Sequence, residues 1–128
     1  MKNGLKINSV DIYKSDIELR EPFRIAIMEI RRAQSLFIRI NTNQEIYGVG
    51  EANPTWGITG ETQAINAAGA GDLARLILDR DPLDIENRMR EIDRFLIRNS
   101  TLRSAFDMAL YDILGKAAEL PLYALIGG

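Results

Sequence analysis

The strongest hydrophobic pattern in the chain lies near its C-terminal end. Apolar residues recur there at helical spacing and form one wide stripe: Leu102, Ala105, Phe106, Ala109, Leu110, Ile113, Leu114 and Ala117. Ser100 or Thr101 stands where a helix cap is expected, and Pro121 stops the run. No other segment carries so much apolar surface, so we expect the earlier elements to pack on this helix.

Alternating apolar and polar positions predict strands in the first fifty residues. Leu5–Leu19 reads as a strand, and its apolar phase slips near Ser15, which suggests a bend or bulge. Gln34–Asn41 and Ile46–Glu51 alternate cleanly on either side of a polar turn and form a hairpin. Phe23–Arg32 has no clean period and is predicted to be a loop that runs into a strand. Together these segments predict a three-stranded antiparallel meander.

Helical patterns occupy the rest of the chain. Asn53–Gly60 is punctuated by proline and glycine and reads as a loop, after which Thr59 can cap a helix over Gly60–Leu78. The expected packing face of that helix is small: Ala64, Ala67, Ala68, Gly71 and Ala74. Pro82 opens a second helix, with a face formed by Ile85, Met89, Ile92 and Leu96. Strands followed by a bundle of three helices indicate an α+β fold.

Composition narrows the functional classes. A chain of 128 residues with 46% hydrophobic content is enough for one domain with its own core. The net charge of −2 provides no global field that would recruit nucleic acid or an anionic membrane. The absence of Cys and His removes disulfides, thiolates and the commonest general base. No targeting signal or membrane-spanning segment is recognised, so the cytoplasm is the expected location.

Carboxylates and glycines offer few candidates for a catalytic or metal site. Gly48-Val49-Gly50 follows a strand but lacks the third glycine and the helix of a dinucleotide site, so a strand end that needs small residues is favoured. Arg103–Asp107 and Asp112–Lys116 are each spaced for a surface ion pair on the helix. Glu51, at a strand end, is the most suggestive carboxylate, but no second ligand accompanies it.

Two further features leave alternatives open. Basic residues are dense in the first third of the chain: Arg20, Arg24, Arg31, Arg32 and Arg39. A nucleic-acid face is conceivable there, but a solvated sheet face or a carboxylate-binding loop is favoured because the domain as a whole is not basic. Trp56 stands alone in its loop, and a ligand-facing role is as plausible as packing. The residues alone therefore indicate a soluble α+β domain without a catalytic constellation.

A family resemblance is carried by two segments, SAFDMALYDILGK (Ser104–Lys116) and PLYALIGG (Pro121–Gly128). They resemble the end of the N-terminal capping domain of the enolase superfamily, and most closely the muconate-lactonizing and dipeptide-epimerase group. The order of predicted elements agrees with that domain throughout. The resemblance implies that residues 1–128 are a capping domain and that the (β/α) barrel which would follow is absent from this chain.

In that family the barrel holds Mg²⁺ through carboxylates and supplies the lysines that move a proton next to the substrate carboxylate. The resemblance therefore implies no catalytic residue and no metal ligand in this chain, which by itself is expected to bind no Mg²⁺. The capping domain supplies two specificity loops, which by position are Glu21–Met28 and Gly48–Thr62. The implied substrate-binding residues are Phe23, Arg24, Met28, Trp56, Ile58 and Thr59.

The same resemblance bears on the substrate. Ile58–Gly60 resembles dipeptide epimerases more than other members, whereas relatives that act on acidic dipeptides carry Arg where Met28 aligns. The resemblance implies that the full-length enzyme epimerises a small or hydrophobic dipeptide. The capping domain and the barrel domain would bind this substrate together, and the enzyme is expected to be a homo-oligomer. The alternatives are the lid of a muconate-lactonizing cycloisomerase and a stand-alone α+β binding module.

Overall fold

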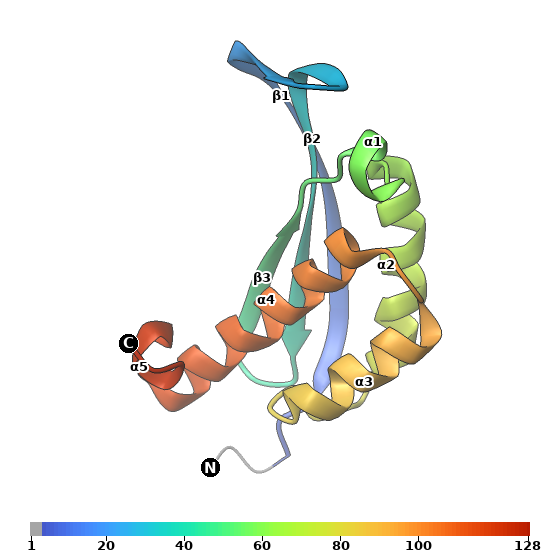
Figure 1. Ribbon diagram of the computed structural model, residues 1–128. Coiled ribbons are helices and arrows are strands. Elements are labelled where there is room, and N and C mark those ends of the chain that lie inside the picture. Colours follow the sequence, from blue (N-terminus) through green and yellow to red (C-terminus); the bar gives the residue numbers. More distant parts are fainter. Residues whose placement is uncertain (1–3) are drawn as a thin grey trace.

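Three antiparallel strands form the sheet of this protein, in the order β1-β2-β3 (Figure 1). The strands are β1 (Ile7–Ile25), β2 (Met28–Thr42) and β3 (Tyr47–Ala52) in a computed structural model that describes residues 4–128. The predicted three-stranded meander, followed by helices, is confirmed.

The β1–β2 hairpin is longer than the sequence pattern predicted. Pairing continues to Ile25↔Met28, so the prediction of a loop over Phe23–Arg32 was wrong. Figure 1 shows this end of the hairpin projecting beyond the helices, and its residues are largely exposed on both faces. An element without a buried face has no need for an apolar period, which explains why the pattern failed there.

The predicted bulge near Ser15 was also misplaced. Ser15 pairs regularly with Ser35, and the register shifts on either side of it, between Ile7 and Ser9 and between Glu18 and Phe23. The apolar phase changes near Ser15 because the strand leaves the core there, and Ile17, on the opposite face, is 61% exposed.

Five helical segments follow the sheet: α1 (Trp56–Thr59), α2 (Gln63–Ile77), α3 (Ile85–Phe95), α4 (Ser100–Ala118) and α5 (Leu122–Leu125). The predicted loop over Asn53–Gly60 therefore contains one helical turn. α2 starts later than predicted because the Thr62 hydroxyl, rather than that of Thr59, accepts the backbone N–H of Ile65 at 3.2 Å.

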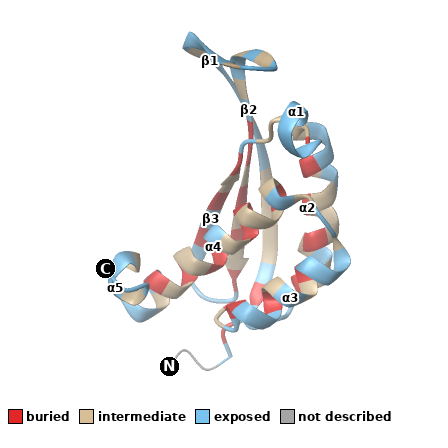
Figure 2. Ribbon diagram, in the orientation of Figure 1, coloured by how far each residue is buried: buried red, intermediate tan, exposed pale blue. Residues whose placement is uncertain are grey.

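Helix α4 lies directly on the sheet and forms the centre of the core, as predicted. Phe106 is fully buried, together with most of the predicted stripe (Figure 2). A Cβ atom at Gly50 would lie 1.8 Å from the carbonyl oxygen of Ala105, and one at Gly48 would lie 1.9 Å from that of Ala109. The two glycines are therefore needed for the close approach of helix and strand.

The packed face of α2 overlaps only in part with the one predicted, of which Ala67 is partly buried against the core. Its buried residues are Asn66, Ala70, Leu73 and Ile77, whereas Ala64 and Ala68 are exposed. Burying Leu73 and Ile77 removes more apolar surface from water than burying alanines, which outweighs the close approach that small residues permit. On α3, Ile85 and Ile92 of the predicted face are buried, and Met89 and Leu96 are partly buried.

Side chains of α4 occupy the free edge of β3. The carboxylate of Asp112 accepts the backbone N–H of Val49 at 3.0 Å, and the ammonium of Lys116 donates to the carbonyl of Tyr47 at 2.7 Å. The predicted Asp112–Lys116 pair is present at 3.0 Å. These contacts satisfy edge groups that would otherwise be open to another strand.

The other predicted pair on α4 was wrong, because Arg103 binds Asp93 of α3 at 3.0 Å instead of Asp107. None of the helices among residues 4–128 has the length and apolar character that crossing a membrane requires.

Candidate functional site

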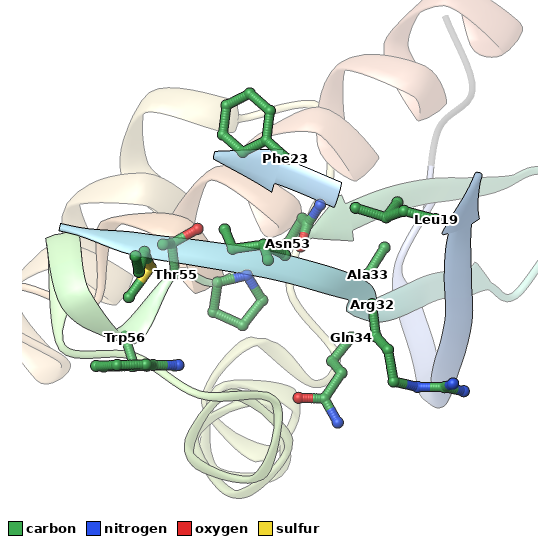
Figure 3. A pocket seen from close by; sticks show the side chains of 11 residues that line it. Leu19, Phe23, Arg32, Ala33, Gln34, Asn53, Thr55 and Trp56 are labelled. Atoms are coloured by element: carbon green, nitrogen blue, oxygen red, sulfur yellow. The ribbon is translucent and has the colours of Figure 1, made fainter. Parts of the chain in front are cut away.

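A pocket of about 350 Å³ lies along the projecting part of the hairpin, between the β1–β2 pair and the segment that follows β3 (Figure 3). Most of its wall is apolar: Leu19, Phe23, Met28, Ile30, Ala33, Pro54 and Trp56. The polar lining residues are Arg32, Gln34, Asn53 and Thr55. We call this site the hairpin pocket. Its size and mixed lining are those of a small-molecule site.

The charged group in the wall of the hairpin pocket already has a partner. The Nε atom of Arg32 donates to the carboxylate of Asp16 at 2.7 Å, across the β1–β2 pair. The wall therefore combines apolar surface with neutral hydrogen-bonding groups, and its guanidinium is balanced by a carboxylate.

The two predicted specificity loops, Glu21–Met28 and Gly48–Thr62, touch one another. A Cβ atom at Gly57 would lie 2.4 Å from the terminal methyl of Met28, so the Met28 side chain rests against the backbone of α1. Next to this contact, Trp56 is 67% exposed on the rim of the pocket. The hairpin end and α1 thus form one wall, although the two residues in contact lie far apart in the sequence.

Three of the six proposed substrate-binding residues meet in the hairpin pocket. Phe23 comes from β1, Met28 starts β2, and Trp56 starts α1. Figure 3 shows that Phe23 and Trp56 reach the site from different segments.

The other three proposed residues lie outside the pocket lining. Arg24 forms an ion pair with Glu29 at 3.1 Å on the hairpin. Ile58 is exposed on α1, and the hydroxyl of Thr59 accepts the backbone N–H of Glu61 at 3.4 Å. Arg24 and Thr59 thus make local contacts, within the hairpin and in the turn after α1.

Sequence reasoning missed the lining residues that the strands supply, such as Leu19, Ile30 and Ala33. The available signal was strand pairing rather than periodicity. Extending the hairpin to its two-residue tip pairs Phe23 with Ile30, and both residues line the pocket. Asn53 and Thr55 also line the pocket, although the sequence pattern predicts only a loop at these positions.

Three arginines of the basic stretch form ion pairs along the hairpin. Arg24 and Arg31 both bind Glu29, Arg31 at 2.7 Å, while Arg32 binds Asp16.

Within residues 4–128, no three acidic, histidine or cysteine side chains converge in a way that could hold a metal ion. The described residues therefore do not fit a Mg²⁺ site.

Two carboxyl groups outside the pocket lining have shifted pKa values. Burial of Glu61 disfavours its charged form, but hydrogen bonds from Leu102, Thr101 and Thr59 outweigh burial and hold the pKa below its usual value. Burial raises the pKa of Asp107, and the negative charge of Asp93 adds to the effect. Glu61 directly follows the segment that carries Trp56, and Trp56 lines the pocket. Glu61 is therefore connected to the pocket through the backbone of that segment.

Comparison with known families identifies the domain. Residues 7–127 match the model of the mandelate racemase / muconate lactonizing enzyme N-terminal domain. The chain is 36% identical over 122 residues to a D-Ala-D/L-Ala epimerase from Cytophaga hutchinsonii, covering 95% of this chain and 33% of the relative. It is also 36% identical over 124 residues to a hydrophobic dipeptide epimerase from Enterococcus faecalis, covering 97% of this chain and 35% of the relative.

Solved structures agree with the sequence matches. The fold superposes with a TM-score of 0.94 on a dipeptide epimerase from Cytophaga hutchinsonii complexed with Mg and D-Ala-L-Val, covering 96% of this chain and 33% of that one at 36% identity. An L-Ala-D/L-Glu epimerase from Bacillus subtilis, solved as a substrate-liganded complex, gives a TM-score of 0.91 at 30% identity, covering 96% of this chain and 34% of that one.

The chain spans about a third of the length of these relatives, which places the match in a single domain of longer proteins. The family match covers nearly all of the chain, and the sheet and helices agree with the solved structures. The chain therefore belongs to the mandelate racemase / muconate lactonizing enzyme N-terminal domain family, and its homologues include dipeptide epimerases of the enolase superfamily.

Proposed function

We propose that this chain is the capping domain of a dipeptide epimerase, and that its hairpin pocket receives a side chain of the dipeptide. The observation that carries the proposal is an apolar pocket built jointly by the hairpin end and α1. The shared fold with dipeptide epimerases supports it. In this proposal, a barrel domain outside this chain completes the site, and the cap excludes water from it.

The chemistry of the reaction belongs to the rest of the proposed enzyme. Mg²⁺ held by that part would stabilise the negative charge that develops when a proton next to a carboxylate is removed. We assign to the residues described here the binding and orientation of the dipeptide. Phe23, Met28 and Trp56 are the side chains to which we assign that role.

We propose small or hydrophobic dipeptides as the substrate class. An acidic side chain placed against Met28 would lose water without gaining a cationic partner, because Arg32 is already paired with Asp16. On protein mutational scales such desolvation without a partner costs about 1–3 kcal/mol for a neutral polar group, and it costs more for a charged carboxylate. The names of the Cytophaga hutchinsonii and Enterococcus faecalis relatives, which refer to Ala-Ala and to hydrophobic dipeptides, agree with this choice.

Replacing Met28 in the complete enzyme tests the substrate assignment. Met28→Arg supplies a fully charged partner and is expected to shift relative kcat/KM towards Ala-Glu and away from Ala-Ala and Ala-Phe. The expected shift is about tenfold or more, the scale of a hydrogen bond to a charged group. Met28→Leu, which keeps an apolar side chain of similar size, is the matched control and should leave the ranking of the three dipeptides unchanged.

An equal loss of activity on all three dipeptides would mean that Met28 only packs against Gly57 and does not select the substrate. That outcome would leave the family assignment intact.

The second candidate function is the lid of a muconate-lactonizing cycloisomerase, a class of enzyme that the family description also names. Assaying one preparation of the complete enzyme with muconate and with the three dipeptides separates the two candidates. Turnover of muconate without any dipeptide epimerisation would replace the first proposal with the second.

A further inference from the structure

The segment of residues 53–60, which carries Trp56, lies between two buried ends. Ala52, at the end of β3, is fully buried, and Glu61 is only 2% exposed. Every residue between them is exposed or half-buried (Figure 2). The segment therefore has no core residue of its own, and its position depends on its two ends and on the contact between Gly57 and Met28.

The buried end at Glu61 is attached to another element of the core. One carboxylate oxygen accepts the backbone N–H of Thr101 at 3.1 Å, and the other accepts that of Leu102, also at 3.1 Å. These N–H groups belong to the first turn of α4 and have no partner within the helix. Asn99, the residue that precedes α4, makes no side-chain capping bond.

Glu61 thus replaces the cap that α4 lacks in its own sequence. A carboxylate is suited to this place because the N-terminus of a helix carries partial positive charge. Hydrogen bonds from two backbone N–H groups also fix both oxygens, so the side chain has little freedom to move. The cap that the sequence predicted at Ser100 or Thr101 is therefore provided by a residue about 40 positions earlier.

The turn between Trp56 and Glu61 is closed by hydrogen bonds. The backbone N–H of Gly60 donates to the carbonyl of Trp56 at 3.0 Å, and Gly60 has a φ of 76°, which favours glycine. The hydroxyl of Thr59 accepts the backbone N–H of Glu61. A displacement of Glu61 would consequently be transmitted to Trp56 and the pocket rim.

We propose that Glu61 is a positioning residue for the hairpin pocket, because its buried carboxylate ties the end of segment 53–60 to the first turn of α4. The contact acts through Trp56 and not on a ligand. The proposal goes beyond the function proposed above and holds whichever dipeptide or other molecule occupies the pocket.

Hydrogen exchange of the ligand-free complete protein tests this role. Glu61→Gln keeps the length of the side chain but faces one of the two N–H groups with an amide NH₂. We expect the amides of Ile58, Thr59 and Gly60 to exchange about tenfold faster or more, since a hydrogen bond to a charged group contributes on that scale. Exchange within α3 should remain unchanged.

The control must separate local loosening from a general loss of stability. Ile77→Val removes one buried methyl group at the far end of α2 and leaves Glu61 and its partners in place. Compared at equal distances below their melting temperatures, the Ile77 variant should retain wild-type exchange in segment 53–60. Faster exchange in the Glu61 variant alone supports the proposal.

Equal exchange in both variants would overturn the proposal. Glu61→Asp, which keeps the charge but is one methylene shorter, provides a second measurement and should loosen the same amides to a smaller extent. If neither Glu61 variant folds, Glu61 serves the stability of α4 alone, and the positioning role is rejected. Because no substrate is present, failure here is distinguishable from failure of the epimerase proposal.

Discussion

At the scale of single residues, the fold depends on two glycines in β3. Gly48 and Gly50 have no side chain, which lets α4 lie against the strand backbone. Any Cβ atom at these positions would meet a helix carbonyl, a group that cannot rotate away as the end of a long side chain can. The effect of a methyl group therefore depends on the position of the glycine rather than on the residue type.

Adding one methyl group at two different glycines should change stability in opposite directions. Gly50→Ala forces α4 away from β3 and is expected to cost about 1–3 kcal/mol or more, as overpacking does. Gly71→Ala, on α2, meets nothing within 4 Å and should stabilise the protein by about 0.5–1 kcal/mol, since alanine is the better helix former. Thermal unfolding of both variants checks this, and a stable Gly50→Ala would contradict the close approach.

Asn66 is a buried polar residue that is expected to lower the stability of the fold. It is fully buried on α2, and neither its side-chain nitrogen nor its oxygen has a hydrogen-bond partner among residues 4–128. Replacement by a similarly sized apolar residue removes the desolvation penalty of an unpaired amide. Asn66→Leu is expected to raise the free energy of unfolding by about 1 kcal/mol in chemical denaturation. A clear loss of stability would show that the amide is hydrogen-bonded in solution.

At the scale of elements, sequence patterns predicted secondary structure reliably where one face of an element is buried and the other is exposed to solvent. The α4 stripe and the alternation in β2 near the core are of this kind, and both were predicted. The outer half of the hairpin has two exposed faces and gave no pattern. On α2 the sequence offered a plausible stripe of small residues, but the pattern could not weigh it against the larger apolar area of Leu73 and Ile77. The stripe consists of Ala64, Ala67, Ala68, Gly71 and Ala74.

Removing the largest fully buried side chain of α4 should destabilise the whole domain. Phe106 is at the centre of the helix that contacts β3, and Phe106→Ala is expected to cost about 3–5 kcal/mol. Tyr123→Ala, on α5, is the control, because that ring is 65% exposed and its loss should change stability by at most about 0.5 kcal/mol. A Phe106 variant that melts within a degree or two of wild type would contradict the central role of α4.

At the scale of the whole molecule, the candidate site was only half predictable. The resemblance pointed to Phe23, Met28 and Trp56, and these residues do line one pocket. The contact of Met28 with Gly57 and the attachment of Glu61 to α4 join segments far apart in the chain. Such contacts leave no periodic signal in a single sequence, so they emerge only when the chain is folded.

The acid stability of the domain should reveal the two shifted carboxyl groups. The pKa of Glu61 is lowered from about 4.5, so Glu61 stabilises the fold above that pH, and its contribution is lost as the pH falls through the lower folded value. Asp107 has a raised pKa, so its charge costs stability near neutral pH, and that cost disappears as the pH falls.

Unfolding free energies measured from about pH 7 to pH 3 should therefore diverge for the two neutralised variants. Glu61→Gln should be less stable than wild type near neutrality, and the deficit should shrink in acid. Asp107→Asn should be more stable than wild type near neutrality, and its advantage should shrink in acid. Stability curves that run parallel to that of wild type would contradict both pKa shifts.

The absence of any buried residue in segment 53–60 has an evolutionary consequence. Sequence change between Ala52 and Glu61 does not disturb the core, because both anchoring residues stay in place. The sequence of the pocket rim can thus vary between relatives, whereas the residues of the sheet and of α4 remain constrained by core packing. A domain built in this way can acquire new substrates without first acquiring a new fold.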